Sequence, residues 1–333
     1  MTAVGRAADA LLEASVIGSF SRIGISARSR LLPEFTSDAR PSFAGRVAIV
    51  TGATSGLGRA TATELARRGG SVHFLARDLA RAERAQRQIA AEASCGQVSY
   101  GLADLDDLDS VRAFAREFGA RHDRLDVLIH GAGAIHRDYR VNDAGIELTV
   151  AGQVIAPFLL TRLLLPALRA AGSSPAAGPS RVITVSSGGM YAQRLDPQIL
   201  QLTPSGYNGV TAYARAKRAQ VALSREWARR LAGTGVAFHA MHPGWAATAG
   251  LGAALPGFHR VMRPILRSPQ QGADTIVWLA TADARALGSG KFWHDRRRRS
   301  EYLLPWTRES SPAVAARLWE CIAELPATAA QPA

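Results

Sequence analysis

The sequence predicts an α/β fold in which a single doubly wound parallel sheet carries helices on both faces and follows an N-terminal helical extension. From residue 46 onward, short apolar runs alternate with longer segments of helical periodicity. A glycine-rich segment, TGATSGLG, directly follows the first apolar run. The 333 residues, 47% hydrophobic and 20% charged, have a globular composition and suffice for one large domain with extensions. The predicted sheet is of the Rossmann type.

Residues 1–44 are expected to form the helical extension. Its apolar residues recur at helical spacing with arginines beside them: Leu12, Val16, Phe20, Ile23, Arg22, Arg28 and Arg30. Such a helix either packs on the body of the protein or lies on a membrane surface. Both interpretations stay open, so a peripheral membrane contact through residues 1–40 remains a hypothesis. Pro41 marks the join to the next domain.

Residues 45–309 are expected to form the Rossmann domain. Its expected strands contain, in chain order, VAIVTG, VHFLAR, VSYGLAD, LDVLIHGAG, RVITVSSGG and VAFHAMHPG. Helical segments follow from residue 57, after residue 77, after residue 104, over about 141–170 and over 211–231, with a Gly/Ser/Pro loop near 172–180. Residues 310–333 should add a short helix and a tail.

The sequence also indicates in which cellular compartment the protein is expected. Asp9 and Glu13 interrupt the region where a secretory signal would be apolar, and no run approaches the roughly 20 apolar residues of a membrane span. Cys95 and Cys321 have no metal-ligand spacing and make no disulfide framework. We therefore expect a cytoplasmic protein without a bound metal. The net charge of +13 suits a phosphate-bearing partner or an acidic membrane surface.

The glycine-rich segment is a candidate phosphate-binding loop. Gly52, Gly56 and Gly58 stand between a strand and a helix, where glycines permit a tight turn and close approach to a pyrophosphate. The helix N-terminus adds free N–H groups and a favourable dipole. A purely structural turn is the alternative interpretation, but the position after the first strand favours dinucleotide binding.

The ends of the second and third strands carry candidate adenosine contacts. Arg77, in LARD, offers a guanidinium to a 2′-phosphate and so favours NADP(H), whereas Asp78, the next residue, offers a competing carboxylate and keeps NAD(H) open. Asp104 closes the third strand, where its carboxylate would accept a hydrogen bond from the adenine or cap the following helix.

Tyr213 and Lys217 are the candidate reacting groups. They stand four apart on a predicted helix and so share a face, and Lys217 and Lys291 are the chain's two lysines among 40 basic residues. Lowering a tyrosine pKa from about 10 to about 7 requires about 4 kcal/mol, which one cation about 4 Å away supplies at an effective dielectric of about 20. Lys217 is thus expected to make Tyr213 an acid/base at neutral pH.

Further polar residues follow the later strands. Ser187, or its neighbour Ser186, is placed to hold a substrate oxygen while Tyr213 transfers a proton. In HPGWAAT, Pro243 and Gly244 provide a backbone turn and Thr248 provides a hydroxyl, and together they would hold the nicotinamide amide. A polar strand end and a simple turn are the structural alternatives.

The ordered motifs TGATSGLG, LAD, HGAG, VSS, YARAK and PGWAAT resemble the short-chain dehydrogenase/reductase (SDR) family over residues 45 to about 295. RVITVSSGGM and MHPGWAAT resemble the orphan SDR family member 12 group, close to retinol-dehydrogenase-like enzymes. The resemblance implies a Rossmann fold, a Ser-Tyr-Lys mechanism and an NADP-type cofactor. It also implies cofactor contacts from Tyr213, Lys217 and the following residues: Thr51, Ser55, Leu57, Leu105, Gly131, Ala132 and Gly133.

Two departures from the family pattern stand out. The family's NNAG is HGAG, with His130 and Gly131 in place of two asparagines, and Gln153 aligns with the asparagine that completes the catalytic tetrad. Because the family's water relay uses the main-chain carbonyl at that position, impairment at most is expected. His130 is interpreted as a packed strand-end histidine.

The leading hypothesis is an NADP(H)-dependent oxidoreductase that transfers hydride between the nicotinamide and a small lipophilic carbonyl or alcohol substrate. The alternative is a catalytically impaired dinucleotide-binding module. Apolar side chains expected near the pocket mouth are Met190, Tyr191, Trp245, Phe258, Trp278 and Trp293. The run Arg296 to Arg299 lacks interleaved aromatics and is interpreted as solvated, so no nucleic-acid partner is expected. A homo-oligomer stays open.

Overall fold

The computed structural model describes residues 3–36, 42–173, 178–309 and 311–325. One eight-stranded sheet has the order β3-β2-β1-β4-β5-β6-β7-β8. Its strands are β1 (Val47–Thr51), β2 (Ser71–Ala76), β3 (Gln97–Leu102), β4 (Val127–His130), β5 (Ser180–Val185), β6 (Val236–Met241), β7 (Lys291–His294) and β8 (Arg297–Arg298). β1 to β7 pair in parallel, which confirms the predicted doubly wound sheet. The sequence did not predict β7 or the antiparallel edge strand β8.

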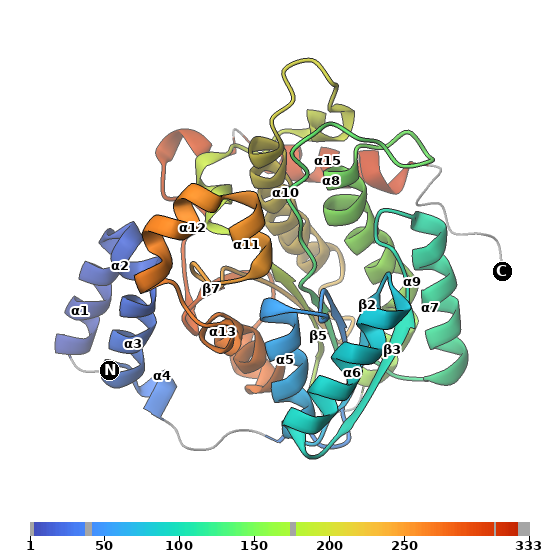
Figure 1. Ribbon diagram of the computed structural model, residues 1–333, viewed down its shortest axis with the longest axis horizontal. Coiled ribbons are helices and arrows are strands. Elements are labelled where there is room, and N and C mark those ends of the chain that lie inside the picture. The colour runs from blue at the N-terminus through green and yellow to red at the C-terminus, as the bar shows by residue number, and fades with distance from the viewer. Residues whose placement is uncertain (1–2, 37–41, 174–177, 310, 326–333) are drawn as a thin grey trace.

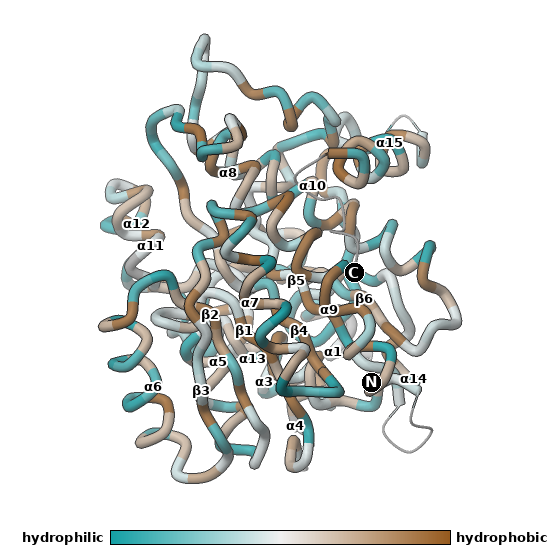
Figure 2. The backbone as a smooth tube through the Cα atoms, turned by 90° about the vertical axis from the view of Figure 1, so that its right-hand side faces the viewer, coloured by the Kyte–Doolittle hydropathy of each residue, from teal (hydrophilic) through white to brown (hydrophobic). Residues whose placement is uncertain are grey.

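Helices cover both faces of the sheet (Figure 1). One face carries α5 (Gly56–Arg67), α6 (Leu79–Ala93) and α13 (Pro269–Thr281), and the other carries α7 (Leu108–Arg121), α9 (Ala156–Gly172) and α10 (Gly209–Arg230), with α15 (Ala313–Ala323) packed on α10. Each face has its own apolar core, so the central strands are buried on both sides and read as continuous apolar runs. Figure 2 shows the hydrophobic segments along β5 and α9.

The helix before β5 begins later than predicted. Residues 141–147 form an extended turn in which the Asn142 side chain accepts hydrogen bonds from Ala144 and Ile146, so the helix starts with α8 (Leu148–Val150) and continues through a π-helical turn, Ala151–Ile155, into α9. Contrary to expectation, this 25-residue segment is long and apolar enough to span a membrane, but 72% of its most apolar window is buried inside the protein. It is therefore the core helix of one sheet face.

The N-terminal extension consists of short helices rather than one amphipathic helix. They are α1 (Ala3–Ala14), α2 (Val16–Phe20), α3 (Arg22–Leu31) and α4 (Pro33–Thr36). Ser15 and Ser21 begin α2 and α3 by accepting hydrogen bonds from main-chain N–H groups. These breaks divide the predicted stripe, because Phe20 is buried whereas Val16 and Ile23 are exposed. Pro41, the predicted join, lies outside the described residues.

A buried charge cluster attaches this extension to the end of the sheet. Arg28 is fully buried and pairs with Asp9 at 2.8 Å, Glu13 at 2.8 Å and Asp295 at 2.7 Å. Arg267 also pairs with Asp295, at 2.6 Å. Burial alone would raise the pKa of Asp295, but His294 and the two arginines hold it well below its usual range. Arg28 therefore belongs to the packed side of the extension and not to an exposed basic face.

The Arg296 to Arg299 run belongs to the same end of the sheet and is not a solvated run. Arg296 pairs with Asp274, and Arg297 and Arg299 pair with Asp9. Arg298 lies over the Trp293 ring, 5.7 Å from its centroid. These arginines hold the extension against β7 and β8.

Candidate active site

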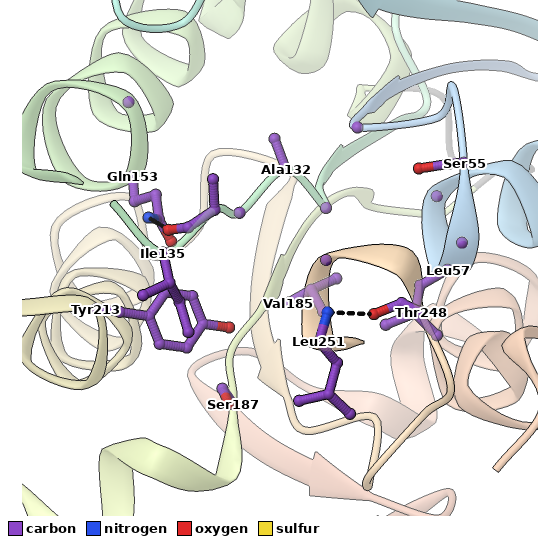
Figure 3. A pocket seen from close by; sticks show the side chains of 18 of the residues that line it. Ser55, Leu57, Ala132, Ile135, Gln153, Val185, Ser187, Tyr213, Thr248 and Leu251 are labelled. Carbon is purple, nitrogen blue, oxygen red and sulfur yellow. Dashed lines mark hydrogen bonds between the residues drawn. The ribbon is translucent and has the colours of Figure 1, made fainter. Parts of the chain in front are cut away.

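A pocket of about 580 Å³ lies at the carboxyl ends of the parallel strands, where the strand order reverses between β1 and β4. Every predicted site residue except Thr51 lines it: Gly52, Ser55, Gly56, Leu57, Gly58, Arg77, Asp104, Leu105, Gly131, Ala132, Gly133, Gln153, Ser187, Tyr213, Lys217, Pro243, Gly244 and Thr248. In Figure 3, Tyr213 and Ser187 lie on one side of the pocket and Ser55 and Leu57 on the other. The fold thus gathers residues from six strand ends.

The glycine-rich loop lies too close to other backbone for larger residues. Gly52 has φ +74°, and a Cβ there would stand 2.8 Å from the Ala132 Cα. A Cβ on Gly58 would stand 2.3 Å from the Gly52 oxygen. Thr51 lies beneath the pocket, and its hydroxyl accepts hydrogen bonds from the main-chain N–H groups of Gly131 and Ala132, at 3.0 and 3.1 Å. The glycine-rich turn at the start of α5 therefore leaves room for the pyrophosphate of a dinucleotide to approach the main chain.

The adenosine end of the pocket is lined by Arg77 and by Arg81, which the sequence reasoning missed. Arg77 is exposed at the end of β2. Asp78, the expected competitor, caps α6 by accepting a hydrogen bond from the Arg81 N–H at 2.8 Å. Asp104 lines the pocket and does not cap α7, whose cap is Asp107. The guanidinium groups of Arg77 and Arg81 therefore suit a 2′-phosphate, while the Asp78 carboxylate caps the helix.

Tyr213 and Ser187 meet in the pocket, where Ser187 hydrogen-bonds the phenol of the half-buried tyrosine. Burial raises the pKa of Tyr213, and the bond to Ser187 acts in the opposite direction. Ser186 is a structural residue, because its hydroxyl donates to the Lys217 carbonyl at 3.0 Å. Both serines line the pocket, but Ser187 is the one that hydrogen-bonds Tyr213.

Lys217 differs from expectation in its effect on Tyr213. Its ammonium nitrogen lies 5.5 Å from the Tyr213 ring centroid and donates to the Val185 carbonyl at 3.0 Å. Burial lowers the pKa of Lys217 to about 7. The predicted downward shift of the Tyr213 pKa is not found: burial raises this pKa, and Lys217 is not among the groups that lower it.

Gln153 occupies the fourth tetrad position in an unexpected way. Its side-chain Nε2 donates to the Ala134 carbonyl at 2.6 Å, while its buried Oε1 has no hydrogen-bond partner. The main-chain carbonyl, expected to be available to water, accepts a hydrogen bond from Gln220 Nε2 at 2.5 Å. His130 is a packed histidine, as interpreted: it bonds the Thr161 hydroxyl at 2.8 Å, and burial together with the Lys217 charge lowers its pKa to about 3.

The apolar wall of the pocket overlaps only partly with the predicted set. Trp245 and Phe258 line it, and their rings meet edge to face at 5.2 Å. Met190, Tyr191, Trp278 and Trp293 instead pack in the cores of the protein. Lining residues that the sequence reasoning missed include Ile135, His136, Val210, Leu251 and Leu255. Leu251 belongs to α11 (Ala249–Ala254) and Phe258 to α12 (Pro256–Met262), short helices without a strong apolar periodicity.

The loop from Pro243 to Thr248 is anchored from two sides. The Trp245 N–H donates to the Phe20 carbonyl of α2 at 2.7 Å. A Cβ on Gly244 would stand 2.2 Å from the Arg267 guanidinium, so this glycine permits the loop to pass the buried arginine. Thr248 caps α11 by accepting from the Leu251 N–H at 3.2 Å (Figure 3). The N-terminal extension therefore supports one wall of the pocket.

These residues provide a proton donor, an ammonium group, a hydroxyl and a dinucleotide-shaped cradle around one apolar pocket. Within the described residues, no group of three or more His, Cys, Asp or Glu could hold a metal ion. The arrangement suits proton transfer coupled to hydride transfer.

Comparisons with known proteins agree with this arrangement. The family model for short chain dehydrogenases matches residues 46–255. Human dehydrogenase/reductase SDR family member 12 is 40% identical over 285 residues, which cover 85% of this chain and 87% of that protein. Human retinol dehydrogenase 13 is 34% identical over 323 residues, 93% of this chain and 92% of that protein. A solved structure of a candidate NAD(P)-dependent gluconate 5-dehydrogenase from Beutenbergia cavernae, with NADP bound at low occupancy, has a TM-score of 0.62 and 30% identity, covering 76% of this chain and 96% of that chain.

Proposed function

The chain belongs to the short-chain dehydrogenase/reductase family, and from that premise we propose that it is an NADP(H)-dependent oxidoreductase of lipophilic carbonyl or alcohol compounds. The observation that carries the proposal is the convergence of Tyr213, Ser187 and Lys217 at the inner end of a pocket whose outer end is a glycine cradle. A binding module would need the cradle, but it would not need a buried phenol beside a serine and an ammonium group.

The preference for NADP(H) is supported by the charges around the adenosine end. Arg77 and Arg81 would hold the 2′-phosphate, since a guanidinium group matches phosphate oxygens bidentately. Asp78 also lines the pocket, but its carboxylate caps α6 and is outnumbered by the two guanidinium groups. The Beutenbergia structure, similar over most of its length, binds NADP. When bound, the cofactor would supply or accept hydride at its nicotinamide ring.

The protein's own contribution to chemistry is the positioned proton of Tyr213. Because burial raises the pKa of Tyr213, the phenol is protonated at neutral pH, and this is the form that donates to a carbonyl oxygen. Ser187 would hold that oxygen beside the phenol. Lys217 would stabilise the phenolate that remains and bind the ribose hydroxyls. The reductive direction is therefore the proposed one.

The substrate class follows from the wall opposite the cradle. Trp245, Phe258, Leu251, Leu255 and Ile135 make this side of the pocket apolar, so binding would depend mainly on hydrophobic contact. One relative is named for retinol, an apolar alcohol, which fits such a wall. We include a peripheral membrane contact in the proposal, because Leu11, Ile17 and Ile23 of the extension and Val261 of α12 are exposed apolar residues.

The proposal is tested by a screen of carbonyl compounds with NADPH, followed by Tyr213→Phe on any substrate found. We expect this variant to keep its fold and its NADPH affinity but to lose about 10²-fold or more in turnover, as the loss of a positioned acid usually costs. Tyr139→Phe is the matched control, because that hydroxyl donates to the Leu202 carbonyl away from the pocket. Undiminished turnover in Tyr213→Phe would contradict the mechanism. NADPH binding without turnover across a broad panel would favour the non-catalytic binding module.

A further inference from the structure

Gln220 lies one helical turn after Lys217 on α10 and contacts two parts of the candidate site at once. Its Oε1 accepts a hydrogen bond from the Lys217 ammonium at 3.0 Å, and its Nε2 donates to the Gln153 main-chain carbonyl at 2.5 Å. Both Gln220 and Lys217 are buried, at 4% and 2% exposure. The orientation of the amide is determined by its partners, because an ammonium group can only donate and a carbonyl can only accept.

The Gln153 carbonyl is available because the helix is irregular there. In the π-helical turn Ala151–Ile155 the main-chain bonds shift to the fifth residue, as in the bond from the Ala156 N–H to the Ala151 carbonyl. The Gln153 carbonyl then accepts from a side chain of another helix. Gln153's own amide turns away to the Ala134 carbonyl, so it does not take over this contact.

Lys217 depends on neutral partners. Among the described residues, the titratable groups that face it are Tyr213 on its own helix and His130 on β4, whose pKa of about 3 leaves that ring uncharged at neutral pH. The ammonium donates to two acceptors, the Val185 carbonyl and Gln220 Oε1. A buried charge is costly unless it is hydrogen-bonded, so each acceptor has a large effect on the protonation of Lys217.

We propose that Gln220 is a positioning residue that links Lys217 directly to the π-helical turn, in place of a water relay from the Gln153 carbonyl, and so keeps the ammonium charged and directed toward the cofactor side of the pocket. The inference rests on the proposed function of Lys217 and extends it to a residue outside the Ser-Tyr-Lys set. A glutamine side chain fixed at both ends leaves Lys217 less free than a water chain would.

The chain's two lysines allow a direct test without a substrate. In protein labelled with [ε-¹³C]lysine, Lys217 and Lys291 give two side-chain signals, which Lys291→Arg assigns, and exposed Lys291 serves as an internal reference. We expect Gln220→Met, which keeps the length of the side chain but removes the amide, to lower the titration midpoint of Lys217 by about one pH unit, the size of one charge-assisted hydrogen bond. Gln220→Glu places a carboxylate beside the ammonium and should raise the midpoint above that of the unmodified protein.

Gln86→Met is the matched control, because Gln86 Nε2 also donates to a main-chain carbonyl, that of Val98 at 2.8 Å, far along the chain from the site. It should leave the Lys217 signal unchanged. An unchanged Lys217 midpoint in both Gln220 variants would overturn the proposal. If Gln220→Met does not fold, the upward shift in Gln220→Glu decides alone.

NADPH affinity and the pH profile of turnover give the second readout. We expect Gln220→Met to weaken NADPH binding several-fold and to move the pH dependence of kcat in the same direction as the Lys217 midpoint, which a general loss of stability would not do. Equal pH profiles in the variant and the unmodified protein would contradict the positioning role. If the Lys217 midpoint shifts as expected but no compound is turned over by the unmodified protein, the inference about Gln220 stands and the proposed function fails.

Discussion

Arg77 is the residue from which the cofactor preference is inferred. We predict that the unmodified protein binds NADPH more tightly than NADH and that Arg77→Ala reduces NADPH affinity by about 10-fold or more, because a bond between a guanidinium and a phosphate is charge-assisted. NADH affinity should change little. Titration by nicotinamide fluorescence measures both.

Arg84→Ala is the control for this prediction, since Arg84 is exposed on the same helix, α6, and does not line the pocket. It should leave both affinities unchanged. Equal affinities of the unmodified protein for NADPH and NADH would contradict the assignment.

Residue-level predictions from sequence succeeded where a side chain's place depends on its strand end. Gly52, Arg77 and Ser187 line one pocket because all the parallel strands end at the same edge of the sheet. The aromatic residues could not be placed, since Trp245 lines the pocket while Trp293, on β7, points into a core, and nearness to a strand end does not reveal the face. Gln220 gave no signal, because its partner is an irregular turn in another helix.

The N-terminal helices carry the membrane prediction. Ile17 on α2 and Ile23 on α3 are each about half exposed, and Arg22 and Arg30 stand exposed beside them. We predict that Ile17→Asp with Ile23→Asp weakens binding to anionic lipid vesicles at least 10-fold, because each buried isoleucine contributes about 1.5–3 kcal/mol and each new carboxylate is repelled. Vesicle sedimentation at low and high salt measures it, with weaker binding of the unmodified protein expected at high salt.

Point substitutions are preferred to deletion of this region, because removal of buried Arg28 would leave Asp295 without one of its partners. Leu79→Asp is the control for adding a charge at an apolar surface position, because Leu79 is half exposed at the start of α6. Identical partitioning of the double variant, the control and the unmodified protein would mean that these isoleucines do not contact lipid.

At the level of elements, regular periodicity predicted well and interruptions did not. The strands and α10 follow their apolar patterns closely. The stripe of residues 12–23 appeared continuous, but the hydroxyls of Ser15 and Ser21 begin new helices and rotate the stripe, so that Phe20 faces inward and Ile23 outward. The Arg296 to Arg299 run appeared solvated because its partner Asp9 is about 290 residues away in the chain.

The whole molecule should be sensitive to mild acid. His130 and His239 are buried with pKa values of about 3, and burial holds the pKa of His242 well below its usual value. The unfolded chain takes up protons near pH 6.5, whereas the folded protein does not until pH falls much further, so the free energy of unfolding decreases as pH falls below 6.5. Each histidine contributes a slope of about 1.4 kcal/mol per pH unit as an upper limit.

Urea unfolding between pH 7.5 and pH 5 measures this dependence. Burial also lowers the pKa values of His73 and His294, so five histidines contribute to the slope. His130→Asn should remove about a fifth of the slope, if the five contribute equally, since an asparagine can bond the Thr161 hydroxyl without titrating in this range. A free energy of unfolding that stays constant from pH 7.5 to pH 5 would show that the buried rings have no such effect.

The ion pair between Arg28 and Asp295 joins residues 267 positions apart in the sequence, which affects the order in which the protein folds during synthesis. During synthesis α3 emerges early, whereas Asp295 emerges only after about nine tenths of the chain has been translated. Until then Arg28 has only its partners within the extension, Asp9 and Glu13, so the first helices cannot complete their docking on the sheet. Because α2 in turn holds the loop at Trp245, the pocket is completed last. A nascent chain interrupted shortly before its end would thus carry most of the fold and an unfinished site.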